Sequence, residues 1–73
     1  MITAKEAIAR HLGGKRGLYR CKACLQDELR EHPASAIANA FDDIRVNEIN
    51  EIFFESDAEC NLCMEPKEVL IAL

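Results

Sequence analysis

The residues most able to do chemistry in this chain are four cysteines, arranged as two Cys-x-x-Cys pairs. The first pair is Cys21 and Cys24, and the second is Cys60 and Cys63. Two thiolates separated by two residues can hold one metal ion from a single turn. Four thiolates form a closed tetrahedral site, which suits Zn²⁺ or the iron of a rubredoxin-like electron carrier. We predict that these cysteines bind one ion, with Zn²⁺ preferred.

This spacing resembles that of the small four-cysteine zinc-binding modules, the zinc ribbons and treble-clef knuckles. The resemblance implies that all four cysteines are ligands and that the ion is structural. Leu25 and Met64 follow the two pairs, where such modules commonly have glycine. Dithiol redox chemistry and disulfides remain alternatives for the same cysteines. His11 and His32 lack ligand spacing to a cysteine, and we expect both to be surface residues.

The length of the chain makes a bound metal energetically important. Seventy-three residues form one domain, 1–73, with a thin candidate core that has no Trp, one Tyr and three Phe. A structural Zn²⁺ contributes about 10–16 kcal/mol of apparent binding free energy. The whole stability of a domain is about 5–15 kcal/mol. We therefore expect an α+β fold whose stability depends on its bound metal.

Two helices are predicted in the first two thirds of the chain. Thr3 and Glu6 form a capping box that starts a helix over 4–12, and two glycines follow it. Pro33 suits the start of a second helix, over 34–43. The apolar residues of that helix fall on one stripe, formed by Ile37, Phe41 and Ile44.

The last third is harder to assign. The apolar run 52–54 favours a short strand or hairpin over 50–55, and residues 56–57 are typical of a turn. Pro66 near the start of the final segment, with acidic residues beside it, favours a third helix over 65–73. The Val-Leu-Ile composition of this segment leaves a strand as the alternative.

The net charge of −4 hides a strong asymmetry. Residues 1–22 carry a net charge of +5, and residues 23–73 carry −9. A nucleic-acid-binding zinc module is therefore one hypothesis for the basic segment 15–22, since an aromatic ring there could stack on a base. Its candidate contacts are Lys15, Arg16, Tyr19, Arg20 and Lys22.

The acidic part of the chain gives the leading hypothesis. A negative surface can bind a basic protein, including one that normally binds nucleic acid. We expect a small regulator or adaptor that acts by protein–protein binding, in the manner of phage-type inhibitors of host machinery such as anti-CRISPR proteins. The first surface to test comprises Asp42, Asp43, Glu48, Glu51 and Glu55.

Other function classes receive little support from the sequence. No catalytic triad, phosphate-binding loop or ordered pair of carboxylates occurs, so we expect no enzyme. The longest aliphatic run, 69–73, is far shorter than the roughly 20 residues of a membrane span. With no signal peptide, we expect a cytoplasmic protein with reduced thiols. A homodimer that buries 69–73 and Phe53-Phe54 is an alternative to a monomer.

Overall fold

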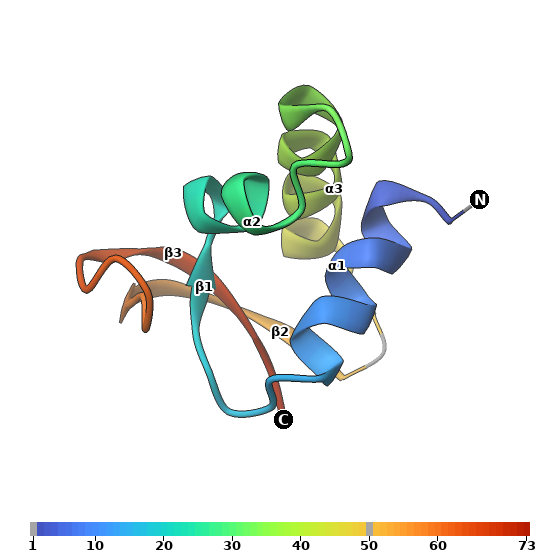
Figure 1. The fold of residues 1–73 in the computed structure, drawn as a ribbon. Helices are drawn as coiled ribbons and strands as arrows, with labels where there is room; N and C mark the ends of the chain where they lie inside the picture. Colours follow the sequence, from blue (N-terminus) through green and yellow to red (C-terminus); the bar gives the residue numbers. More distant parts are fainter. Residues whose placement is uncertain (1, 50) are drawn as a thin grey trace.

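A three-stranded antiparallel sheet with helices packed over one of its faces forms the protein (Figure 1). The computed structural model describes residues 2–49 and 51–73. In this part of the chain the elements are, in order, α1 (Ala4–Gly13), β1 (Arg20–Cys21), α2 (Lys22–Glu28), α3 (Ala34–Val46), β2 (Ile52–Glu59) and β3 (Pro66–Ala72). The predicted α+β fold class is confirmed.

Helix α1 begins as its capping residues predict. The Thr3 hydroxyl accepts a hydrogen bond from the backbone N–H of Glu6 at 3.1 Å, which satisfies one of the free donors of the first turn. Ile8 and Leu12 lie fully buried on the face toward α3 and the sheet. The helix ends at Gly13, one residue beyond the predicted range 4–12.

Helix α3 confirms the prediction over 34–43 and extends it to Val46. Pro33 is its N-cap residue, where the missing backbone N–H is not needed. Ile37, Phe41 and Ile44 are all fully buried. Because Ile44 belongs to the same apolar stripe, the helix continues for a further turn and buries it.

The predicted helix over 65–73 is wrong, because this segment is strand β3. The sheet order is β1-β3-β2, so β3 is the central strand. The four consecutive residues 69–72 are all buried. A run that is buried on both faces is typical of a central strand, whereas a helix of this length would expose part of it. Pro66 stands at the first position of the strand, where proline is tolerated.

Strand β2 confirms the prediction of a strand near 50–55, but it is longer. Asn50 lies outside the described residues, and the strand runs from Ile52 to Glu59. The register changes between the pairs Glu55↔Val69 and Ala58↔Lys67. Two residues of β2, 56–57, therefore face one residue of β3. This arrangement is a β-bulge and not the predicted turn.

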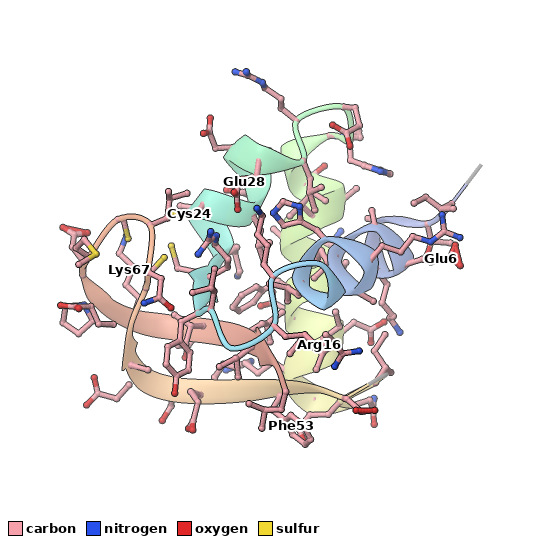
Figure 2. The ribbon with its side chains drawn as sticks, turned by 60° about the horizontal axis from the view of Figure 1, so that its bottom comes forward. Glu6, Arg16, Cys24, Glu28, Phe53 and Lys67 are labelled. Atoms are coloured by element: carbon pink, nitrogen blue, oxygen red, sulfur yellow. The ribbon has the colours of Figure 1, made fainter. Side chains whose placement is uncertain are left out.

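Two hydrophobic clusters hold the elements together. The larger one lies between the helices and the sheet and contains Phe41, the largest fully buried side chain. The smaller one lies at the end of the sheet where β2 and β3 are joined, and it consists of Cys21, Cys24, Cys60 and Val69. Figure 2 shows sulfur atoms gathered at this end of the molecule. The small cluster has little apolar material of its own.

Candidate metal centre

Three separate elements carry the four cysteines to one place. Cys21 ends β1, and Cys24 lies in the first turn of α2. Cys60 and Cys63 belong to the turn that joins β2 to β3, residues 60–65, which we call the hairpin turn. Strand β1 pairs with β3 so that Cys21 lies opposite Val69. The central strand therefore brings the two cysteine pairs together across the sheet.

The sulfur atoms are spaced as a tetrahedral metal site requires. All four Sγ atoms lie within 4.8 Å of one another, and three of the cysteines are buried. The Sγ–Sγ distance is 3.8 Å between Cys21 and Cys63, and 3.7 Å between Cys24 and Cys60. A tetrahedron with zinc–sulfur bonds of about 2.3 Å has edges of about 3.8 Å. Each close contact joins one cysteine of each pair, so a bound ion would link the pairs.

The cysteines are free thiols and not disulfides. The two close Sγ–Sγ distances greatly exceed the S–S bond length of about 2.05 Å. Within residues 2–49 and 51–73, these four cysteines form the one cluster of metal-binding side chains. They can hold a metal ion, as the sequence predicted.

Hydrogen bonds tie the hairpin turn to the segment before β1. The backbone N–H of Cys21 donates to the Cys60 sulfur at 3.4 Å. Asn61 donates its N–H to the Tyr19 carbonyl oxygen at 3.0 Å and accepts the Tyr19 N–H with its side chain. Within the turn, the Met64 N–H donates to the Cys60 carbonyl oxygen at 2.9 Å. Backbone hydrogen bonds therefore help to hold the cysteines in position, in addition to any bound metal.

The four thiols differ in acidity because their surroundings differ. Burial raises the pKa of Cys60, but the backbone N–H groups of Cys63, Leu62 and Cys21 outweigh it and lower the pKa to about 6. Burial raises the pKa of Cys21 and of Cys24 above the ordinary thiol value. Cys60 therefore deprotonates more readily than Cys21 and Cys24, and binding of a cation would displace protons from those two.

Lys67 is the cation placed beside this cluster. Its ammonium group lies 3.2 Å from Glu65, and that carboxylate, followed by the Cys63 and Cys21 sulfurs, raises its pKa. Figure 2 shows Lys67 at the same end of the molecule as Cys24. A four-thiolate site with a dication carries a net charge of −2, which Lys67 partly offsets.

Neither histidine belongs to the sulfur cluster. His11 Nε2 lies 3.0 Å from Glu28 Oε1, and the same oxygen accepts a 2.9 Å hydrogen bond from Arg20 Nε. Arg20 is only 6% exposed. No sequence pattern indicated this buried charged group, since Arg20 stands in a basic run, which is typical of exposed residues.

The basic segment is largely engaged within the fold. Arg20 is buried, so it is not available as a contact for nucleic acid. Lys22 pairs with Asp42 at 2.9 Å and lies over the Phe41 ring. Arg16 donates to the carbonyl oxygen of Leu73. Tyr19 is half-buried against the cysteine cluster, and Lys15 is half-buried.

Most of the predicted acidic contacts are also occupied. Asp42 and Asp43 pair with Lys22 and Lys5, the latter at 2.6 Å. Glu48 accepts the Phe54 N–H at 2.9 Å, and Glu51 lies 4.0 Å from Arg16. In the described part of the chain, the acids with no ion pair or side-chain hydrogen bond are Asp27, Glu31, Glu55, Asp57 and Glu59. Three of these five belong to β2.

Comparison with known proteins gives no relative: no family model, curated protein or solved structure matches the chain. Likewise, no helix among the described residues has the length and apolar character needed to cross a membrane. The chemistry of the site therefore follows from its own geometry.

Cobalt substitution tests the site directly. We expect one Co²⁺ per chain, with the intense visible absorption of a tetrahedral cobalt thiolate, since the four sulfurs already lie near tetrahedral spacing. Cys24→Ser should weaken this absorption strongly, and Ala23→Ser, in the same turn, should leave it unchanged. A pale octahedral spectrum from the wild-type chain would contradict four-sulfur ligation.

Proposed function

We propose that the protein holds a structural Zn²⁺ at the four cysteines and acts by binding a basic protein partner. The sulfur spacing carries the first part of this proposal. Zinc is preferred because closed sites with four thiolate ligands are typical of structural zinc. A rubredoxin-like iron centre would use the same geometry, and it is distinguished by its red colour and by elemental analysis of the purified protein.

A binding role suits this centre better than a catalytic one. Four thiolates fill the tetrahedral coordination sphere, so no position is left for water or substrate. Only Cys63 among the four ligands is half-exposed. The ion would then act through the shape that it imposes on the hairpin turn and on α2.

The binding surface that the structure favours is strand β2. Glu55, Asp57 and Glu59 are exposed, and no ion pair within the described residues neutralises them. Residues 55–68 carry five carboxylates and one lysine, a net charge of −4. A zinc–thiolate centre beside them adds further negative charge. Such a field steers association with a basic surface, which suits a regulator or inhibitor.

Charge reversal on β2 tests the partner surface. The zinc-loaded chain, immobilised and exposed to extract of its native cell, should capture a basic protein that elutes as the salt concentration rises. Glu55→Lys with Asp57→Lys should abolish this capture. The matched control, Asp27→Lys with Glu31→Lys, reverses two other unpaired exposed acids and should not. Capture that survives the first pair of changes would overturn the assignment of β2.

Nucleic acid is the rival ligand, and the same material tests it. With Arg20 buried and Lys22 paired, the segment 15–22 presents few free cations. We therefore expect no binding of DNA or RNA by the zinc-loaded chain even at low salt. Salt-sensitive binding that Lys15→Glu with Arg16→Glu removes would favour the nucleic-acid module instead.

A further inference from the structure

Met64, in the hairpin turn, has a backbone conformation that favours glycine. Its φ is +63°, in the left-handed region. A non-glycine residue there is strained, because its Cβ approaches the backbone. The Met64 side chain is 60% exposed, so packing offsets little of this strain. A glycine at this position would adopt the left-handed conformation without strain. The presence of methionine therefore indicates that the Met64 side chain has a role other than stabilising the fold.

A second large apolar side chain stands in the same turn. Leu62 lies between Cys60 and Cys63 and is 47% exposed. Turns usually present small or polar residues, so two exposed apolar residues here are unusual. Both are next to proposed metal ligands, so metal binding would hold their backbone in place. Preorganised apolar side chains bind a partner with little loss of conformational entropy, and methionine adapts its shape to the surface it meets.

The charge around the turn identifies the kind of partner. Glu59 precedes the turn directly and has no ion pair in the described part of the chain. Glu55 and Asp57 extend the negative surface along β2. Lys67, in the strand that follows the turn, is already paired with Glu65. An occupant of this region therefore needs cationic groups beside apolar ones.

We infer that Leu62 and Met64 anchor the interaction surface, and that they bind a segment of another protein in which Lys or Arg stands next to a large apolar side chain. This inference rests on the proposed protein-binding function and specifies its central contact. Anchors of this kind carry most of the free energy of an interface, and the charged rim supplies specificity.

A library of random 12-residue peptides, selected against the zinc-loaded chain, provides the probe. The selected peptides should combine Lys or Arg with large apolar residues. Leu62→Ser with Met64→Ser should weaken their binding by about tenfold to a hundredfold, the effect of losing two buried apolar side chains. Met64→Gly removes one side chain while it suits the backbone, and it should weaken binding with one zinc per chain retained.

The control variant is Val46→Ser, which removes an apolar side chain that is 72% exposed at the end of α3. It should leave peptide affinity unchanged. Peptides whose affinity is the same for the wild-type chain and for both variants of the hairpin turn would overturn the inference and leave the proposed function standing. If no peptide and no protein of the cell extract binds, the proposed function fails. Light scattering that shows self-association abolished by Met64→Gly would make a second copy the occupant and would also overturn the inference.

Discussion

Removal of the metal is expected to unfold the protein. Among the described residues, the cysteine cluster contains only Val69 as a fully apolar buried residue, with Tyr19 and Ala58 packed beside it. Without a cation, this end of the sheet would hold three buried thiols and the half-buried Cys63 in place of a bonded centre. The binding free energy of a structural zinc ion, about 10–16 kcal/mol, equals or exceeds the stability of most small domains. A strong chelator should therefore abolish the far-ultraviolet circular dichroism of the helices, and added Zn²⁺ should restore it.

Single substitutions distinguish the effect of losing the metal from side effects of the chelator. Cys24→Ser removes one buried ligand, and we expect this variant to be largely unfolded with or without zinc. Ala23→Ser changes an exposed neighbour in the same helical turn and should fold like the wild-type chain. A chain that keeps its helices and its thermal midpoint after complete loss of metal would show that the hydrophobic clusters alone stabilise the fold.

The features that the sequence predicted well are those with local signals. The capping residues Thr3 and Glu6 fix the start of α1 through a hydrogen bond between two residues that are three apart in the sequence. The apolar stripe and Pro33 define α3 in the same way. The cysteines were found from spacing, and the structure brings them together. In each case the physical cause lies within a few residues, so the sequence pattern alone contains it.

The features that the sequence missed depend on distant neighbours. Strand β3 is the central strand, with Leu70 and Ala72 in the larger hydrophobic cluster and Val69 in the cysteine cluster, and nothing within residues 66–72 reveals those partners. The burial of Arg20 depends on Glu28 and on the position of α1. The left-handed backbone of Met64 follows from the hydrogen bond that closes the hairpin turn on Cys60. These long-range constraints decide both the fold and the proposed surface.

Replacing Glu28 with glutamine is expected to cost about 3 kcal/mol of the free energy of unfolding, because a buried guanidinium would lose its counter-ion. Arg20 is almost fully buried and donates to Glu28 Oε1 at 2.9 Å. Arg20 also donates a hydrogen bond to the neutral carbonyl oxygen of Tyr19, at 3.1 Å. Thermal or urea unfolding of the zinc-loaded protein measures the loss. Glu31→Gln, at an exposed acid with no ion pair in the described residues, is the matched control and should change nothing.

The loss should also depend on pH in a defined direction. Burial raises the pKa of Glu28, but hydrogen bonds and charge from His11 and Arg20 outweigh it and hold that pKa below the ordinary value of 4.5. A carboxyl group with a lowered pKa stabilises the fold fully above its unfolded pKa, and this stabilisation disappears as the pH falls through the folded value. The stability gap between wild type and Glu28→Gln should therefore be present above pH 4.5 and shrink below it. Acid also releases zinc, so the gap is measured only over the pH range in which both proteins keep one zinc per chain. A gap that stays constant from neutral pH down to the lowest pH at which both proteins keep zinc would show that the carboxylate charge is not what stabilises Arg20.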